Sequence, residues 1–385
     1  MFGLVGQSPF AGVAWQGLHY LEGLRRLGYD VFYVEDTQEW PYDPEQDTKT
    51  DDLRFTLRYL ERLMTWAGLG DRWAYRSAVR GDAVFGPAAP QFHDLVGSAD
   101  GLINLTGTTV LREEYLRVPV RIYLETDPVQ PQIDVAEGRF IERLASHTHH
   151  FTFGENVGAP DCGVPVGRFQ YRPTRQPVVL DWWDGPAAGG SGGTASEPAA
   201  FTTVANWRQS GKDVRWQGEL YTWSKHHEFL KFLDLPLRTT EPLELALSSL
   251  DGDDRSRLRR HGWRVRDALA LSRDLEPYRD YLRGSRGEFT VAKDQNIRLR
   301  TGWFSDRGAC YLAAGRPVLT QETGFSKLLP TGKGLFGFRT MEEILEALDL
   351  VASDYAGHCR AAGEIAAAYF GADVVLRRLC HEAGL

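Results

Sequence analysis

The chain has 385 residues, more than one typical hydrophobic core holds, so we expect two domains. Its net charge of -8 at pH 7 excludes a general nucleic-acid-binding protein, because such proteins present a basic surface. No apolar run reaches the roughly 18 residues of a membrane span, so we expect no transmembrane segment, although peripheral membrane contact stays open.

Residues 1–34 predict a first βαβ unit. An apolar run at 2–5 fits a buried strand, and a Gly/Ser/Pro loop follows at 6–12. Apolar residues then recur at helical spacing over 13–27, and 30–34 is typical of the next strand. This order of elements predicts a parallel sheet. The loop lacks the GxGxxG pattern, so it does not predict a dinucleotide site.

Two carboxylates follow the predicted strand at 120–124, which comes after a helix at 53–66 and a strand at 101–105. They are Glu125 and Asp127. Ligands of open α/β sheets bind beyond the carboxyl ends of strands. A carboxylate there could act as a base or hold a sugar hydroxyl, while Asp127 could equally well cap the turn.

Residues 184–200 are rich in Gly, Ala and Ser and poor in bulky side chains. Such a segment cannot bury enough surface to fold, so we expect a flexible interdomain segment or a long surface loop. It separates a first domain at 1–183 from a second at 201–365, which a closing helix at 366–385 follows.

The second half again alternates strands and helices. Strands are predicted at 201–205, 243–247 and 289–292, with helices between them. This half is therefore also expected to hold a parallel α/β sheet. Thr340 begins a capping box for a helix that ends near 351.

The stretch at 301–325 has the features of an anion-binding site. Ser305 can cap a helix over 306–314, and Gly315 follows where a helix commonly ends. A strand at 317–320 then leads to the turn at 322–324. The amides of a helix start and of such a turn favour anions, although ordinary helix–strand packing accounts for the same pattern.

The four cysteines are widely scattered and form neither a CxxC pair nor a zinc spacing. The start of the chain also lacks the pattern of a signal peptide. We therefore expect reduced thiols in a cytoplasmic protein, with no metal site. The sequence gives no indication of the oligomeric state.

Two α/β domains, a flexible connection and closing helices resemble the GT-B glycosyltransferases, most nearly the nucleotide-sugar-dependent families 1 and 4. Residues 6–12 and the LGYDVFYVE segment at 27–35 are similar to their acceptor-side loop and second strand. VANWRQSGK at 204–212 resembles the first strand of their donor domain. AAGRPV at 313–318 and ETGF at 322–325 resemble their element near the donor phosphate and sugar.

The resemblance implies two Rossmann-like doubly wound domains with an interdomain cleft. It implies a hexosyltransferase that moves a sugar from a nucleoside diphosphate sugar to the hydroxyl of an unidentified acceptor, with no nucleic-acid partner. Such enzymes need no essential metal or other cofactor, because cations and helix amides stabilise the leaving diphosphate.

The expected site has three parts. The donor would be held by Arg208, Lys212, Lys293, Ser305, Asp306, Arg307, Glu322, Thr323 and Gly324. The acceptor-side loop would contribute Gly6, Ser8 and Gly12. The candidate bases, in order of preference, are Asp127, His19 and Glu125.

One departure from the family pattern stands out. Many retaining members carry an E-x7-E signature before the AAGRPV element, but the aligned positions here are close to Gly302 and Cys310. The stereochemistry therefore stays open. Two alternatives also stay open: a sugar-nucleotide epimerase on the same architecture and a catalytically inactive nucleotide-binding module.

Overall fold

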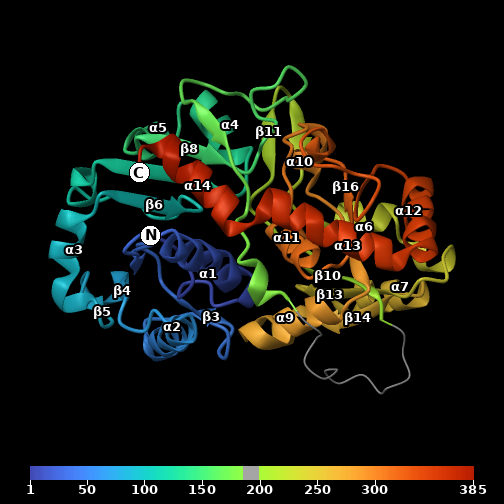
Figure 1. The fold of residues 1–385 in the computed structure, drawn as a ribbon, viewed down its shortest axis with the longest axis horizontal. Helices are drawn as coiled ribbons and strands as arrows, with labels where there is room; N and C mark the ends of the chain where they lie inside the picture. The colour runs from blue at the N-terminus through green and yellow to red at the C-terminus, as the bar shows by residue number, and fades with distance from the viewer. Residues whose placement is uncertain (185–198) are drawn as a thin grey trace.

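The computed structural model describes residues 1–184 and 199–385 and shows a mixed α/β protein with two mainly parallel sheets (Figure 1). The first half of the chain, blue to green in Figure 1, builds one sheet, and the second half, yellow to red, builds the other. The predicted linker lies almost entirely outside the described residues. Within the two described ranges, the helices are all too short or too polar to cross a membrane.

The sheet of the first half has two parts. One has the order β1-β4-β5 and the other the parallel order β6-β7-β8-β9. Phe2 connects them through bridges to Val34 and Asn104. The strands are β1 (Tyr33–Glu35), β4 (Trp73–Arg76), β5 (Val84–Phe85), β6 (Gly101–Leu105), β7 (Val120–Glu125), β8 (His149–Thr152) and β9 (Tyr171–Pro173).

The strand predicted at 2–5 is therefore reduced to bridges at Phe2. The chain turns directly afterwards, because the amides of Gly6 and Gln7 donate to the Glu35 carboxylate at 2.7 and 2.6 Å. Because a side chain accepts the hydrogen bonds of these two amides, they do not need the backbone carbonyls of a neighbouring strand.

The helices of the first half include the one predicted at 13–27, which runs from Ala11 to Arg26. Its predicted apolar positions are buried, among them Trp15, Leu18 and Leu21. The helices are α1 (Ala11–Arg26), α2 (Arg54–Trp66), α3 (Phe92–Ser98), α4 (Gln130–Ala136) and α5 (Ile141–Ala145). Two short antiparallel pairs complete the strands: β2 (Tyr42–Asp43) with β3 (Thr48–Lys49), and β11 (Val214–Trp216) with β12 (Glu219–Tyr221).

The sheet of the second half confirms the doubly wound expectation. Its six parallel strands have the order β14-β13-β10-β15-β16-β17. Successive strands are added on one side of β10 up to β14 and on its other side from β15 onward, so the strand order reverses between β10 and β15. Ligands of such sheets bind outside the carboxyl ends at this reversal. The strands are β10 (Phe201–Asn206), β13 (Leu243–Ser248), β14 (Arg264–Asp267), β15 (Gly287–Thr290), β16 (Val318–Gln321) and β17 (Leu335–Phe338).

The predicted caps in this half are confirmed. The Ser305 hydroxyl accepts from the amide of Gly308 at 3.4 Å, and Thr340 forms a capping box with Glu343. The helices are α6 (His226–Lys231), α7 (Gly252–Arg260), α8 (Ala268–Ser272), α9 (Leu275–Gly284), α10 (Asp294–Arg298), α11 (Asp306–Ala313), α12 (Met341–Ser353), α13 (Tyr355–Ile365) and α14 (Ala372–Ala383).

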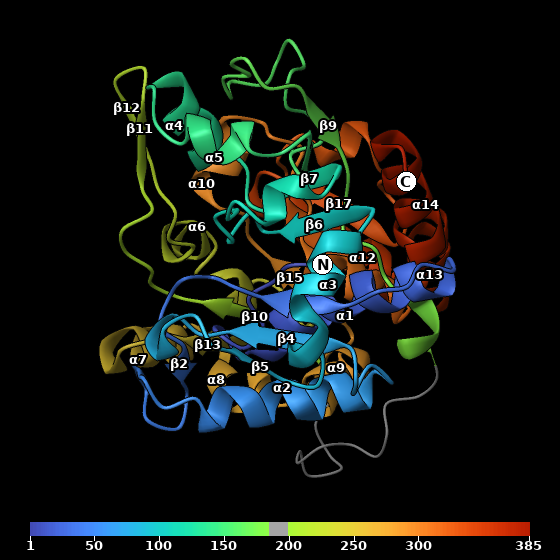
Figure 2. The same cartoon turned by 90° about the vertical axis from the view of Figure 1, so that its left-hand side faces the viewer.

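The C-terminal helix α14 returns to the first half of the molecule. It packs against α1, and the two helices lie side by side in Figure 2. The segment before it is tied to Val178, whose amide donates to Phe370 and whose carbonyl accepts from Ala372. As a result, one hydrophobic core includes both α1 and the helices α11 and α14.

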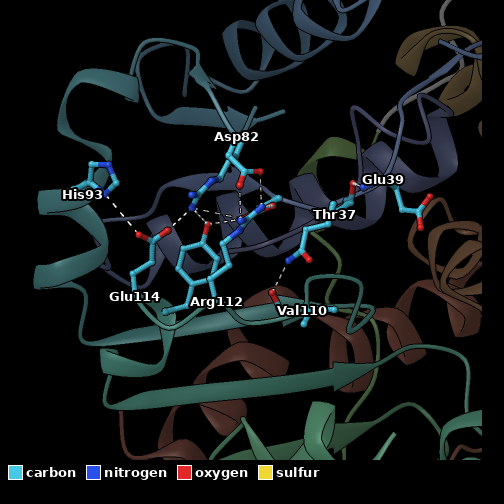
Figure 3. Close-up of polar contacts among 11 residues, drawn as sticks. Thr37, Glu39, Asp82, His93, Val110, Arg112 and Glu114 are labelled. Carbon is cyan, nitrogen blue, oxygen red and sulfur yellow. Dashed lines mark hydrogen bonds and ion pairs between the residues drawn. The ribbon is translucent and has the colours of Figure 1, made fainter. Parts of the chain in front are cut away.

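A network of paired charges lies beside β1 and β4 (Figure 3). Asp36 is 1% exposed and accepts from Arg112 at 2.7 and 3.1 Å and from the Tyr115 hydroxyl at 2.7 Å. Arg112 also donates twice to Asp82, at 2.8 Å each. Arg76 pairs with Glu114 next to this group. The network joins segments that are far apart in the sequence.

Candidate active site

A cavity of about 810 Å³ lies between the two halves. Residues at the carboxyl ends of β7, β10 and β15 line it, together with the first turns of α1 and α11. The reversal point of the second sheet therefore opens into this cavity. Its volume lies within the range of about 300–1,000 Å³ that is usual for small-ligand sites.

Three lysines meet on the second-half wall of the cavity, around two tryptophan rings. The Nζ atoms of Lys293 and Lys212 lie 3.2 and 4.7 Å from the centroid of the Trp223 ring. The Nζ of Lys225 lies 5.8 Å from the centroid of the Trp303 ring. Each lysine comes from a different loop of this half. Three ammonium groups in one cavity suit an anion with two phosphates.

Burial affects the charge of two of these lysines, Lys225 and Lys293. Burial, together with the neighbouring Arg307 and Lys293, lowers the pKa of Lys225 to about 7, although the carboxylates of Glu288 and Asp127 oppose this shift. Burial also lowers the pKa of Lys293, although the Asp127 carboxylate opposes this shift. A bound anion would favour the charged form of both amines. The wall would therefore become more positive when a negative ligand binds.

An ion pair crosses the cavity from one half to the other. Lys293 Nζ donates to Asp127 Oδ1 at 2.6 Å. Desolvation inside the cavity raises the pKa of Asp127, but the ammonium groups of Lys293, Lys212 and Lys225 together outweigh this effect and hold the pKa below its ordinary value. A second contact, from Trp303 Nε1 to the carbonyl of Thr126 at 2.9 Å, joins the same two segments. The side chain of Asp127 is 45% exposed, and this surface faces the cavity.

Glu125 lies deeper, at 2% exposure. Its Oε2 accepts from Thr152 at 2.7 Å and from Gln132 at 2.5 Å. Its Oε1 has no hydrogen-bond partner among the described residues. Burial raises the pKa of Glu125 to about 8, so the group is a neutral carboxylic acid at pH 7. It can hold a proton beside the cavity.

The first turn of α11 forms part of the lining. Ser305, Asp306 and Arg307 all border the cavity. Arg307 is already engaged, because it donates to Glu288 Oε1 at 2.6 Å and to the carbonyl of Val204 at 2.5 Å. Burial raises the pKa of Asp306. The helix thus presents its N-terminal end to the cavity, and Arg307 fixes this end to the sheet.

The structure brings together more than half of the residues that the sequence analysis singled out. Those that line the cavity are Gly12, Glu125, Asp127, Lys212, Lys293, Ser305, Asp306 and Arg307.

Arg208 and His19 lie elsewhere. The half-exposed Arg208 guanidinium donates to Asp254 at 2.6 Å and does not border the cavity. His19 is fully buried beside Trp183 and the amide of Val179, and burial lowers its pKa to about 3. A neutral imidazole without access to the cavity cannot take a proton from a ligand there.

The remaining predicted residues serve the fold around the cavity. The Thr323 hydroxyl donates to the carbonyl of Trp303 at 2.7 Å and so positions that tryptophan. Glu322 is buried and accepts from the amide of Gly324. Gly6 packs beneath Thr56, and the Ser8 amide closes a turn onto the Leu4 carbonyl at 2.9 Å. None of Gly6, Ser8, Glu322, Thr323 and Gly324 is among the lining residues.

Sequence reasoning missed Lys225, Trp223, Trp303 and Gln16, which all line the cavity. Gln16 donates to Asp306 Oδ2 at 3.4 Å across the two halves. The sequence offers one local signal, the lysine and tryptophan two residues apart in a loop between predicted elements. Their proximity to Lys293 depends on the tertiary structure alone.

The backbone around the first-half wall is strained. Thr106 and Phe140 line the cavity with φ angles of 64° and 58°, and Val129 has a φ of 100° beside the lining residue Gln130. Residues other than glycine rarely adopt these values, and they persist where the surrounding structure enforces them. Such positions concentrate at binding sites.

The position that aligns with the first glutamate of the E-x7-E signature cannot carry a side chain here. Gly302 has a φ of 74°, and a Cβ on it would lie 2.7 Å from the amide nitrogen of Asn156. The first half of the molecule therefore occupies that place. Within residues 1–184 and 199–385, no group of three His, Cys, Asp or Glu side chains is arranged to hold a metal ion.

No protein-family model matches the chain, and no curated protein matches it. Solved structures do match. AviGT4, a glycosyltransferase involved in avilamycin A biosynthesis, is 11% identical with a TM-score of 0.54, and the match covers 97% of this chain and 89% of that one. HepE of Anabaena in complex with UDP-glucose is 10% identical with a TM-score of 0.54, over 97% and 96% of the two chains.

Sucrose-phosphate synthase of Thermosynechococcus elongatus is a third match. It is 11% identical with a TM-score of 0.51, and the match covers 94% of this chain and 90% of that one. Likeness at such low identity concerns the fold. It extends over both halves of the molecule. The chain therefore has the GT-B fold of these glycosyltransferases.

Proposed function

We propose that the protein is a glycosyltransferase that transfers a sugar from a nucleoside diphosphate sugar to an acceptor hydroxyl. The observation that carries this proposal is the group of three lysines in the cavity between the halves, opposite Asp127. The fold supports it, since HepE, which shares this fold, was crystallised with UDP-glucose.

In the proposed reaction the bond between the sugar C1 and the diphosphate oxygen breaks, and a bond from C1 to the acceptor oxygen forms. The leaving diphosphate gains negative charge, which the ammonium groups of Lys212, Lys225 and Lys293 stabilise. We propose that these cations allow transfer without a metal ion, and activity in excess EDTA tests this.

Asp127 is the proposed acceptor of the hydroxyl proton. In the structure Lys293 neutralises its charge at 2.6 Å. When a donor diphosphate draws Lys293 toward itself, the pKa of Asp127 loses this depressing influence and moves toward the range that suits a general base. Donor binding would thus activate the base. Glu125, which burial favours in its protonated form at neutral pH, is the less suitable base, because it is 2% exposed and already holds a proton.

The test is calorimetric titration of the folded protein with glucose derivatives of UDP, GDP, ADP and dTDP. We expect Lys293→Ala to weaken binding of the preferred nucleotide roughly tenfold or more, because a charge-assisted contact to phosphate is lost. Arg208→Ala is the matched control. It removes a cation that Asp254 already pairs outside the cavity, and its affinity should equal that of the wild type.

The results separate the alternatives. If no nucleotide sugar binds, the proposal is wrong. Binding followed by a changed sugar without any acceptor would identify an epimerase. Binding without turnover would identify an inactive module, an outcome that the blocked position at Gly302 makes worth testing.

A further inference from the structure

The two walls of the cavity differ in charge. The described lining residues of the second half include Lys212, Lys225 and Lys293, whereas those of the first half include neither lysine nor arginine. The carboxyl groups of the first-half wall are those of Glu125, Asp127 and Asp134. The donor diphosphate and the acceptor therefore meet different electrostatic environments.

The carboxyl groups of the first-half wall are themselves compensated. Burial keeps Glu125 protonated, and Asp127 pairs with Lys293. Asp134 Oδ1 accepts from Arg139 Nε at 3.1 Å and from Gln130 at 3.0 Å. Before a donor binds, this wall is therefore nearly neutral. When the donor diphosphate draws Lys293 away, the Asp127 carboxylate can add negative charge to the wall, and no lysine or arginine that the structure describes lines it.

One arginine, Arg143, lies close to Phe140 of this wall. The guanidinium of Arg143 donates to the carbonyl oxygens of Gly107 and Thr108 at 2.5 Å each. These neutral carbonyls hold Nε and Nη2 of Arg143 toward the backbone, and Arg143 is not among the lining residues. An anionic group that entered here would therefore lose part of its hydration without meeting a lysine or arginine among the described residues of the wall itself. The wall is therefore unfavourable for a phosphorylated or carboxylated molecule.

The same wall offers aromatic surface. Phe140 lines the cavity with 48% of its surface exposed, and its backbone is held at a φ of 58°. Phe10 and Phe153 add two more rings to the lining, and Thr106, Thr108 and Gln130 add uncharged polar groups. Aromatic faces pack against apolar surfaces, and the polar groups can bind hydroxyls.

We propose that the acceptor is an uncharged molecule that carries hydroxyl groups beside an apolar face, such as an alkyl or aryl glycoside, and that the site excludes phosphorylated acceptors. This inference rests on the proposed glycosyl transfer. It adds the chemical class of the acceptor, which follows from the neutral, aromatic first-half wall.

The experiment compares two probes that differ by one phosphate. The protein is saturated with UDP, or with whichever of GDP, ADP and dTDP binds best, and titrated with p-nitrophenyl β-glucoside and with its 6-phosphate. We expect the neutral glycoside to bind roughly tenfold more tightly, because the phosphate must be desolvated without a counter-charge. Equal or tighter binding of the phosphate overturns the inference, and so does a neutral glycoside that fails to bind at millimolar concentration.

A charge-introducing variant provides the second arm. Phe140→Lys places an ammonium group at the exposed rim, and we expect binding of the 6-phosphate to strengthen several-fold while that of the neutral glycoside weakens. Leu237→Lys is the control, since Leu237 is 63% exposed and lies outside the lining, and it should change neither affinity. A 6-phosphate affinity that Phe140→Lys leaves unchanged counts against the inference. If no nucleotide binds, the proposed transfer itself fails, whereas nucleotide binding with a preference for the phosphate overturns the acceptor class alone.

Discussion

At the scale of single residues, Lys225 links the pH of the solution to the charge of the cavity. Burial lowers its pKa to about 7, so its ammonium form prevails below that pH and its neutral amine above it. Only the ammonium form attracts a diphosphate. We therefore expect the affinity for the preferred nucleotide sugar to fall several-fold as the pH rises from about 6 to about 8.5, measured by calorimetry. A nucleotide sugar is the right probe because its two phosphates do not titrate in this interval.

Two variants isolate the contribution of Lys225. Lys225→Arg keeps a permanent charge, so its affinity should depend much less on pH. Lys225→Met keeps the length of the side chain but not its charge, so its affinity should be low throughout the interval. A wild-type affinity that does not change with pH would contradict the assignment of Lys225 to the diphosphate.

At the scale of secondary-structure elements, the charge network beside β1 and β4 joins loops of the first half (Figure 3). Arg112 connects Asp36, which follows β1, to Asp82, which lies between β4 and β5. Arg112→Met removes the main partner of Asp36, which is 1% exposed. It leaves a buried carboxylate with its hydrogen bond from Tyr115 and with the Arg76 guanidinium 4.0 Å away. We expect the free energy of unfolding to fall by about 3 kcal/mol, measured by urea denaturation. Nucleotide affinity should be unchanged, because neither residue lines the cavity.

An exposed ion pair is the control for this variant. Arg54 pairs with Asp52, and their side chains are 84% and 31% exposed. Arg54→Met should cost less than about 1 kcal/mol, because solvent screens such pairs. Equal losses in the two variants would show that the buried network contributes no more than an ordinary surface pair.

At the scale of the whole molecule, the contact of α14 with α1 ties the end of the chain to its beginning. The helices approach so closely at Gly23 that a Cβ there would lie 2.4 Å from Leu376 Cδ1 and 2.9 Å from Ala372 Cβ. Alanine is the better helix former by about 1 kcal/mol. We nevertheless expect Gly23→Ala to lower the free energy of unfolding by about 2 kcal/mol, measured by urea denaturation, because the added methyl group overpacks the interface.

Gly363→Ala is the matched control within α13. A Cβ at Gly363 meets nothing within 4 Å, so the gain in helix propensity should raise stability by up to about 1 kcal/mol. If both substitutions stabilise the protein, the close approach of α1 and α14 does not limit its stability.

The fold class could be predicted because its signals are local. The apolar spacing of α1, the cap at Ser305 and the capping box at Thr340 are short-range patterns, and the structure confirms them. The first strand could not be predicted in the same way. Its apolar run at 2–5 looked like a strand, but the Glu35 carboxylate takes up the amides that would have extended it.

The candidate site was only partly accessible from the sequence. Asp127 and Lys293 stand at the ends of predicted strands, and the carboxyl ends of parallel strands share one edge of a sheet, so their place near a ligand followed from the pattern. Arg208 satisfied the same rule, yet Asp254 draws it away from the cavity. The position of a residue at a strand end predicts where its Cα lies. It does not predict which neighbouring group its side chain will pair with.

The amino-acid sequence by itself determined the α/β class, the second-half parallel sheet and the family resemblance, because each depends on hydrophobic periodicity and on residues close together in the chain. The tertiary structure alone decided which charges share one cavity. Lys225 and Lys293 are brought together from loops far apart in the sequence, and Asp127 faces them from the other half. Electrostatic interactions depend on distance in space and on burial, and neither quantity is encoded in sequence spacing.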